Sequence, residues 1–285
     1  MRRPRVVATL LLVGVTAIWG FTFVPVKQSI AEIPTFQFLG MRFMIAAFLL
    51  LALFLRKALN VSVSALKAGT IAGLALAAGY AFQTLGLRLT GATKAGFITG
   101  LAVVFTPAIA AIVLRRAPGA RALTGVAISV LGLLLLTVGG AFALNVGDGI
   151  VLLCAISFAI HIVILGRFSP NFDAPTLTIV QLGAAGILFS LISAATETIE
   201  APDESVWLAL LTTAVGASAV AFLIQTWAQR HLTPTTTAVT FTMEPVFAGL
   251  AGFILLGERL SAGNWIGAAL ILSAMLFVSA RSAET

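Results

Sequence analysis

Long apolar stretches, separated by short polar breaks, run along the whole chain. Most have about the 20 residues that a helix needs to cross the hydrocarbon core of a bilayer. The pattern therefore predicts an all-α polytopic membrane protein with ten transmembrane helices and short connections. We expect the helices at 6–27, 34–56, 67–89, 94–114, 121–139, 148–166, 175–195, 206–228, 235–256 and 262–280.

Composition agrees with this pattern. Hydrophobic residues make up 60% of the chain, charged residues make up 9%, and the mean hydropathy is +1.09. A soluble domain carries about 25% charged residues, so this chain lacks the polar surface that water requires. The lipid bilayer is therefore its expected partner. The net charge is +7, but Lys and Arg fall between the apolar stretches and form no basic face, which excludes nucleic acid as a partner.

Several polar positions recur in the second half of the chain at one constant spacing. Gln83 reappears as Gln225, and Arg88 reappears as Arg230, each pair 142 positions apart. A single match within apolar sequence means little, but a shared spacing of about half the chain indicates a duplication.

We interpret 1–142 and 143–285 as two five-helix repeats that form one transport unit, with no separate soluble domain. A repeat with an odd number of spans enters the bilayer in the opposite orientation from its copy. Inverted repeats of this kind are typical of carriers, whose substrate site lies where the two halves meet.

The basic residues predict the orientation, because cytoplasmic loops are enriched in Lys and Arg. With both termini placed in the cytoplasm, the other side keeps only Lys27, Arg88, Lys94 and Arg259. The cytoplasmic side then collects Arg2, Arg3, Arg5, Arg56, Lys57, Lys67, Arg115, Arg116, Arg121, Arg167, Arg230 and Arg281.

Two charged residues, Arg42 and Glu244, lie well inside predicted spans. Each costs about 2.5–3.5 kcal/mol at the centre of a membrane helix, so neither is expected to face lipid. Glu244 ends a polar stripe with helical spacing that includes Thr237 and Thr240. The carboxylate either lines a substrate cavity, where it would also be able to couple transport to protons, or is a structural group paired with Arg42 or nearby hydroxyls.

Two prolines lie inside predicted spans, Pro107 in the fourth and Pro245 in the ninth. Proline removes a backbone hydrogen bond and kinks a helix. Interrupted helices in the middle of the membrane are tolerated where they line a cavity. We therefore predict that these two residues are hinges.

Gln83 and Gln225 are the second set of candidates, with Tyr80 on the same helical face as Gln83. Amide groups both donate and accept hydrogen bonds and therefore suit zwitterions or hydroxyl-bearing solutes. The alternative is that they only join helices, which is worth about 0.6 kcal/mol per bond in membranes.

Three further residues complete the expected cavity. Trp19 and Phe23 are four residues apart on the first span. Trp19 is too deep to be an interfacial anchor, so it either lines the cavity or packs in the core of the bundle. His161 on the sixth span is either a proton relay or a satisfied residue of the helix bundle. Small-residue pairs such as Gly69 and Gly73 indicate close helix packing and specify no dimer, so we expect a monomer or a weak homodimer.

Several motifs are missing from the sequence. It has no phosphate-binding G-x-x-x-x-G-K-[ST] loop, no H-E-x-x-H motif and no G-x-S-x-G motif. The one cysteine, Cys154, forms neither a disulfide nor a cysteine metal site within the chain. We therefore expect neither an enzyme nor a cofactor.

The closing stretch of the second half, Glu244-Pro245-Val246 followed by Leu256-Gly257-Glu258-Arg259-Leu260, resembles the EamA-type branch of the drug/metabolite transporter superfamily. Trp19-Gly20 and Arg42 also match family positions. The resemblance covers essentially the whole chain. It implies a multi-pass protein of the bacterial inner membrane that moves small metabolites, often by exporting amino acids, through a central cavity. The first half departs from the motif, because Arg115-Arg116-Ala117-Pro118 contains no acid where the second half has Glu258.

The expected function is a secondary carrier that exports a small polar or amphipathic metabolite by rocking of the two repeats. Arg42 or a helix N-terminus would hold a substrate carboxylate. Gln83, Gln225 and Thr240 would bind its polar groups, and Trp19, Phe23 and Tyr80 would pack on its apolar part. The alternatives are a passive channel without alternating access and a membrane-embedded enzyme acting on lipid, for which the sequence shows no catalytic cluster.

Overall fold

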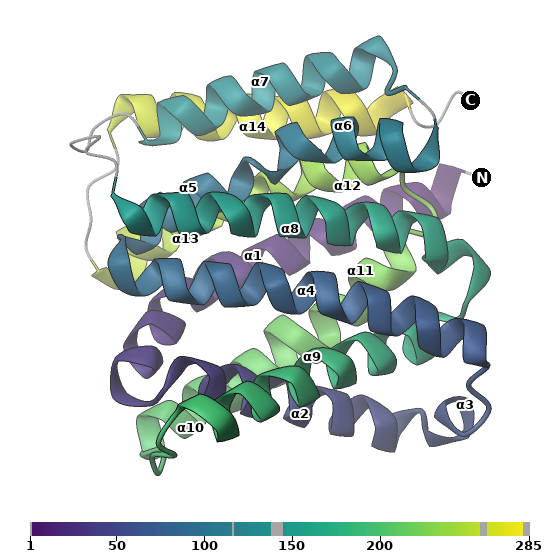
Figure 1. Ribbon diagram of the computed structural model, residues 1–285. Coiled ribbons are helices and arrows are strands. Elements are labelled where there is room, and N and C mark those ends of the chain that lie inside the picture. The colour runs from purple at the N-terminus through teal and green to yellow at the C-terminus, as the bar shows by residue number, and fades with distance from the viewer. Residues whose placement is uncertain (1, 116, 138–144, 257–260, 282–285) are drawn as a thin grey trace.

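The protein is a bundle of helices in the computed structural model, which describes residues 2–115, 117–137, 145–256 and 261–281 (Figure 1). Within these residues, 8 helical stretches are long and apolar enough to cross a membrane, and Ala120–Leu135 is a shorter apolar helix. The 8 stretches are Arg3–Glu32, Thr35–Leu53, Val63–Leu89, Lys94–Leu114, Val146–Asn171, Ala174–Thr196, Glu204–Ala228 and Ala262–Ser279. The chain is therefore a multi-pass membrane protein.

The first half of the chain contributes seven helices, and the short ones complete or extend longer spans. They are α1 (Arg2–Glu32), α2 (Thr35–Leu53), α3 (Leu55–Ala58), α4 (Val63–Leu89), α5 (Ala92–Gly100), α6 (Ala102–Leu114) and α7 (Ala120–Thr137).

The second half contributes the remaining described elements. They are α8 (Val146–Phe168), η1 (Ser169–Asn171), α9 (Ala174–Thr196), α10 (Glu204–Thr212), η2 (Thr213–Val220), α11 (Ala221–Ala228), α12 (Pro234–Phe241), α13 (Met243–Leu256) and α14 (Ala262–Arg281). The Gly257-to-Leu260 part of the family motif, with Glu258, lies outside the described residues.

Helices from the two halves pack against one another throughout the bundle. α7 lies along α14, α2 packs against α9, and α4 packs against both α8 and α9 (Figure 1). Small residues allow this close approach. A Cβ built on Gly73 of α4 would lie 2.5 Å from the carbonyl oxygen of Gln181 on α9, so any larger residue would push the two helices apart.

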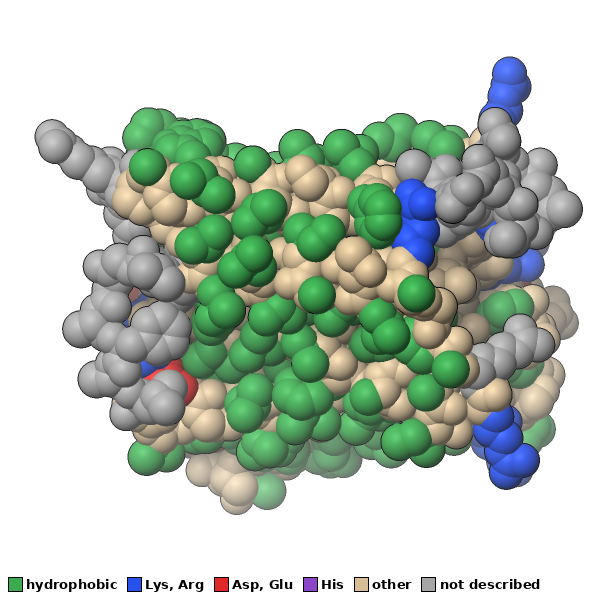
Figure 2. Space-filling view, turned by 90° about the horizontal axis from the view of Figure 1, so that it is seen from above, with side chains coloured by type: hydrophobic (Ala, Val, Ile, Leu, Met, Phe, Trp, Pro, Cys, Tyr) green, Lys and Arg blue, Asp and Glu red, His purple; other side chains and the backbone are tan. Residues whose placement is uncertain are grey.

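The two ends of the bundle differ in charge. The N-terminal and C-terminal helix ends lie at the same end, together with α3 and its Arg56 and Lys57 (Figure 1). The face in Figure 2 carries its most prominent basic side chains at this end, an apolar band across the middle, and an acidic side chain with some basic surface beside it at the opposite end. This distribution is the one expected for a protein whose middle lies in lipid.

Three of the predicted spans are irregular near their middle. The fourth breaks at Leu101, between α5 and α6, and the ninth breaks at Thr242, between α12 and α13. Pro245 explains the second break, because its ring excludes a hydrogen bond to the carbonyl of Phe241, where α12 ends. Pro107 instead lies inside α6, beyond the break in its own span. The two breaks are 141 residues apart, close to the spacing of the sequence repeat.

The third irregular span contains a π-helix. Element η2 (Thr213–Val220) separates α10 from α11 and widens the helix over eight residues. A π-helix is rare, appears mostly as a short insertion and is frequent at functional sites. Nothing in the hydropathy pattern predicts it.

Candidate functional site

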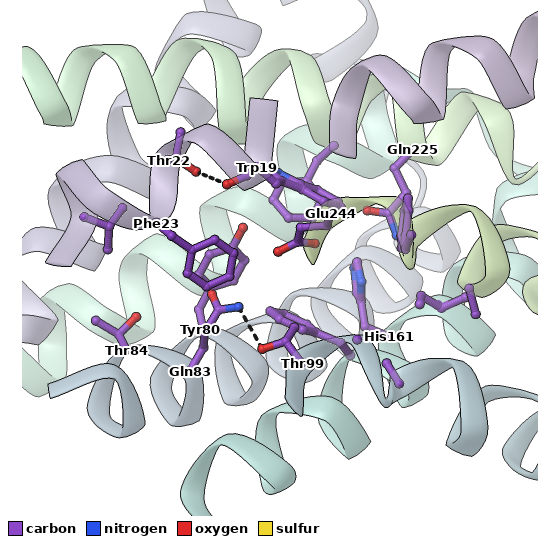
Figure 3. Close-up of a pocket in the computed structure, with 18 of the residues that line it drawn as sticks. Trp19, Thr22, Phe23, Tyr80, Gln83, Thr84, Thr99, His161, Gln225 and Glu244 are labelled. Carbon is purple, nitrogen blue, oxygen red and sulfur yellow. Dashed lines mark hydrogen bonds between the residues drawn. The ribbon is translucent and has the colours of Figure 1, made fainter. Parts of the chain in front are cut away.

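A cavity of about 70 Å³ lies between the two halves of the bundle (Figure 3). This volume holds a few water molecules and is far below the 300–1,000 Å³ of a typical small-molecule pocket. The lining residues are Trp19, Thr22, Phe23, Val26, Arg42, Tyr80, Gln83, Thr84, Leu87, Thr99, Gly100, Ala102, Val103, Phe158, His161, Ile162, Phe222, Gln225, Ala238, Phe241 and Glu244. They come from both halves of the chain.

All the cavity residues predicted from the sequence line this space except Thr240. The side chain of Thr240 is fully buried, and its hydroxyl donates to the carbonyl of Thr236 on its own helix. The prediction placed Thr240 and Glu244 on one continuous helical face. The break at Thr242 interrupts that face, so only Glu244 reaches the cavity.

Arg42 of α2 is held by hydroxyl and carbonyl groups. Its Nε donates to Ser218 Oγ at 2.8 Å, and its Nη2 donates to Tyr80 Oη at 3.3 Å and to the carbonyl of Ala217 at 3.4 Å. The guanidinium also stands over the Tyr80 ring, 4.9 Å from its centroid. A guanidinium has five N–H donors, so these contacts leave donors for a ligand.

The π-helix η2 provides the acceptor that Arg42 and Trp19 share. Trp19 Nε1 donates to the carbonyl of Ala217 at 2.8 Å, from α1 across to the second half. The indole also packs against Phe222 and Phe241, with ring centroids 5.5 and 5.0 Å away. Trp19 is therefore fixed in position by three residues of the second half.

Glu244 of α13 reaches into the cavity and is only partly buried (Figure 3). Within the described part of the chain, its carboxylate has no hydrogen-bond donor and no cation within 4 Å; the ion pairs found there are Lys57–Asp173 and Lys94–Asp148. The expectation that Arg42 or nearby hydroxyls satisfy Glu244 is therefore not met, because Arg42 is directed to η2.

Gln225 of α11 is 1% exposed and lines the cavity. Its Nε2 donates to Gln229 Oε1 at 3.1 Å, and Gln229 Nε2 donates to the carbonyl of Ile162 at 2.7 Å. The backbone carbonyl can only accept, which fixes the orientation of both amides. Gln225 Oε1 is then left buried without a partner among the residues that the structure describes.

His161 of α8 is 2% exposed and also lines the cavity. Its Nε2 lies 2.8 Å from Gln181 Oε1, and Gln181 Nε2 donates to Thr226 Oγ1 at 3.0 Å. An amide oxygen only accepts, so Nε2 of the histidine carries a proton and Nδ1 of the neutral ring is an acceptor.

Gln83 of α4 both lines the cavity and joins two helices, the two roles that the sequence left open. It lines the cavity, and its Nε2 donates to Thr99 Oγ1 of α5 at 3.3 Å (Figure 3). Tyr80, one turn earlier, packs edge-on against Phe43 and Phe158 at centroid distances of 4.9 and 5.3 Å.

Three phenylalanines that line the cavity were not among the residues predicted from the sequence. They are Phe158, Phe222 and Phe241, and phenylalanine in an apolar span gives no signal of its own. For Phe222 a signal was present, since it is four residues after Ser218 and three before Gln225, and so shares their helical face.

A second polar cluster, also missed, lies at the end of the bundle opposite the termini. Asp148, 4% exposed, accepts from Lys94 Nζ at 2.5 Å, from Thr90 Oγ1 at 2.7 Å and from the backbone of Asn145 at 2.8 Å. Lys27 of α1 adds a hydrogen bond to the carbonyl of Thr90. This cluster joins the first half to the start of α8. No group of three or more metal-ligating side chains is present among the described residues.

Comparison with known proteins places these features in a family. The chain is 35% identical over 277 residues to an uncharacterized transporter of Archaeoglobus fulgidus, with 97% of this chain and 87% of the relative covered. It is 27% identical to the uncharacterized transporter YoaV of Bacillus subtilis, covering 91% and 92% of the two chains. It is 28% identical to the uncharacterized inner membrane transporter YedA of Escherichia coli, covering 92% and 87%.

A crystal structure with 20% sequence identity superimposes with a TM-score of 0.79 and covers 98% of this chain and 99% of the other, which shows the same fold. The model of the EamA-like transporter family matches the chain twice, at residues 6–138 and 145–280. The protein is therefore a membrane transporter and belongs to the EamA-like transporter family of the drug/metabolite transporter superfamily.

Proposed function

We propose that the protein is a secondary carrier that exports a small metabolite, an amino acid or a related compound, across a bacterial inner membrane. The observation that carries this proposal is the cavity, which lies between the two halves and contains both Arg42 and Glu244 without an ion pair between them. Two charges of opposite sign inside the bundle, Arg42 buried and Glu244 partly buried, are each costly in a membrane and suit a polar solute better than a purely structural role.

The architecture that we propose has ten spans in two inverted repeats, 1–142 and 143–285, with both termini in the cytoplasm. The double match of the family model supports the two repeats. The basic residues near the termini support the orientation. The transport unit that we propose is a monomer or a weak homodimer.

Alternating access is the proposed mechanism. The cavity is too small for a metabolite, so the helices around it must move before a substrate enters. The breaks at Leu101 and Thr242 lie beside the cavity and at equivalent positions of the two halves, where a change of angle would open one side or the other. The cluster around Lys94 and Asp148 closes the end opposite the termini and would have to separate for release there.

Proposed substrate contacts follow from the cavity lining. Arg42 would hold a carboxylate through its remaining donors, and Gln83 and Gln225 would bind polar groups. Trp19 and Phe23 would pack on the apolar part of the solute.

Proton coupling through Glu244 is a further part of the proposal, supported by a cavity-facing carboxylate without a hydrogen-bond partner in the described chain. The titratable groups on the surrounding helices are Arg42 on α2, Tyr80 on α4, and Cys154 and His161 on α8. If the proton is carried at Glu244, an imposed pH gradient changes counterflow in the wild type and has no effect in Glu244→Gln.

The test uses purified protein in liposomes loaded with unlabelled amino acids, one at a time, and follows uptake of the labelled form. A carrier gives saturable counterflow that exceeds uptake into empty liposomes. Uptake that increases linearly with concentration, with no stimulation by internal substrate, would instead indicate a passive channel and contradict alternating access.

A further inference from the structure

We infer that the second half of the chain recognises a protonated amino group, through an acceptor site formed by Glu244, Gln225 and His161. This inference rests on the proposed function, since it names the group by which the cavity selects its substrate. The three side chains come from α13, α11 and α8, and Figure 3 shows them on the same side of the cavity.

The strongest observation is Gln225 Oε1, which has no hydrogen-bond partner in the described part of the chain. The amide chain that runs from Ile162 through Gln229 to Gln225 is anchored at a backbone carbonyl, so its direction cannot be reversed without losing a hydrogen bond. A buried polar atom left without a partner destabilises the folded protein, because its lost hydration is not replaced. Such an atom beside a cavity is explained by a ligand that donates to it.

Glu244 supplies the charge of the acceptor site. Its carboxylate reaches the same cavity and meets no donor among the described residues, so both of its oxygens are available. Gly20 on α1 allows close packing against the segment that carries Glu244. A Cβ there would lie 2.8 Å from the carbonyl oxygen of Glu244 and 2.7 Å from the backbone nitrogen of Ala248, so the glycine lets α1 pack directly on the turn that carries the acid.

His161 adds a third acceptor. Because Gln181 Oε1 takes the proton on Nε2, the neutral ring has only Nδ1 left, and Nδ1 accepts. A carboxylate, an amide oxygen and an imidazole nitrogen together match the three N–H bonds of a primary ammonium group. They do not match a carboxylate or an ether, which have no hydrogen to donate.

Aromatic rings surround this acceptor site. Trp19, Phe222 and Phe241 line the cavity, and the two phenylalanine rings pack on Trp19 at centroid distances of 5.5 and 5.0 Å. The faces of such rings attract a desolvated ammonium.

The amino group could belong to an amino acid or to a simple organic amine, and Arg42, in the first half, distinguishes the two. A zwitterionic amino acid would use both Arg42 and Glu244, whereas a simple organic amine would use only the acceptor site. In both classes of substrate, the acceptor site binds the same group, a protonated amine.

The experiment measures binding to the purified full-length protein in detergent by isothermal titration calorimetry. Each of two matched probe sets contains an amino acid, the amine that lacks its carboxylate, and the acid that lacks its amino group. The sets are L-alanine, ethylamine and propionate, and L-phenylalanine, 2-phenylethylamine and 3-phenylpropionate. We expect saturable binding of the amine-bearing probes in at least one set, and binding of the corresponding carboxylate that is weaker by about tenfold or more. This comparison uses the wild type and is independent of how any variant folds.

Variants then assign the selectivity to residues. Glu244→Gln and Gln225→Met are each expected to weaken amine binding by about tenfold, the loss expected when a hydrogen bond to a charged group is removed. The matched control is Glu204→Gln, which makes the same chemical change at an exposed position at the start of α10 and should leave binding unchanged. A zwitterion that binds more tightly than the simple amine, with the difference lost in Arg42→Gln, identifies an amino acid as the source.

The inference is overturned if the carboxylate probes bind as tightly as the amines, if no amine-bearing probe binds, or if Glu244→Gln, folded by its melting curve, binds amines like the wild type. Its failure is distinguishable from failure of the carrier proposal. Counterflow of a solute without an amino group would support the carrier proposal and contradict the amine site. Amine binding without counterflow would support the amine site and contradict the carrier proposal.

Discussion

The two places in the bundle where charges are buried are built in opposite ways. At the end opposite the termini, Asp148 has a cation, a hydroxyl and a backbone N–H around it, so both of its oxygens are satisfied. In the central cavity, Arg42 and Glu244 have opposite charges and yet form no ion pair with each other. Arg42 is held by neutral groups, and Glu244 is held by none that the structure describes.

The difference shows how a structural charge can be separated from a functional one. A buried charge is tolerated only when its lost hydration is replaced. At Asp148 the protein itself makes the replacement, which ties two halves together. In the cavity the replacement is incomplete, and a substrate would complete it. Substitutions at the two places should therefore have different effects on stability.

Asp148→Asn is expected to lower the free energy of unfolding by about 3 kcal/mol, the lower end of the range for breaking a buried ion pair, because Lys94 is partly exposed. Glu244→Gln is expected to change it by less than about 1 kcal/mol, since that carboxylate loses no partner. Unfolding of both variants by sodium dodecyl sulfate in mixed micelles measures the difference. Equal destabilisation by the two would show that Glu244 is a structural acid.

Gly20→Ala tests the packing that places Glu244. The added Cβ would lie 2.7 Å from Phe247 Cβ and from the backbone of Ala248, so α1 and α13 must separate, at a cost of about 1–3 kcal/mol. Gly14→Ala on the same helix is the control, because a Cβ there meets nothing within 4 Å and alanine favours helix by up to about 1 kcal/mol. Melting temperatures of the two variants should move in opposite directions.

Ser218→Ala removes one hydrogen bond to Arg42 and is expected to cost about 1.5 kcal/mol, the lower limit for a bond to a charged group. Ser193 is the matched control. Its Oγ is buried without a partner among the described residues, so Ser193→Ala should be neutral or stabilising. Denaturation of both variants under the same conditions checks the pair. No loss of stability for Ser218→Ala relative to Ser193→Ala would mean that Arg42 does not depend on its hydrogen bond to η2.

Lys57→Met addresses the exposed ion pair with Asp173, whose side chains are 53% and 42% exposed. Exposed ion pairs contribute about 0–1 kcal/mol, so Lys57→Met should lower the free energy of unfolding by no more than about 1 kcal/mol. The same micelle titration, set beside Asp148→Asn, shows how far burial strengthens an ion pair in this protein. A loss as large as that of Asp148→Asn would remove the distinction between the two ends of the bundle.

Much of the candidate site was predictable because polar residues are conspicuous in apolar spans. Arg42, Gln83, His161, Gln225 and Glu244 were all expected at the cavity for that reason, and the structure brings them together.

Other features of the site gave no such signal. The carbonyl of Ala217 is exposed to its two donors by a π-helix, and a backbone group has no identity in a sequence. Thr240 was misplaced because its helical face is interrupted at Thr242, two residues before Glu244.

The hydropathy pattern is enough to show that the chain is helical, that it belongs in a membrane, and which polar residues must avoid lipid. These follow from the free energy of transferring each residue into hydrocarbon, which depends on composition and periodicity alone. The partners of the individual polar groups became clear only from the packing of the helices. Arg42 found Ser218 and Tyr80, while Glu244 and the oxygen of Gln225 found no donor that the structure describes. Hydrogen bonds depend on distances of about 3 Å between helices, and helix breaks and close packing at glycine set those distances.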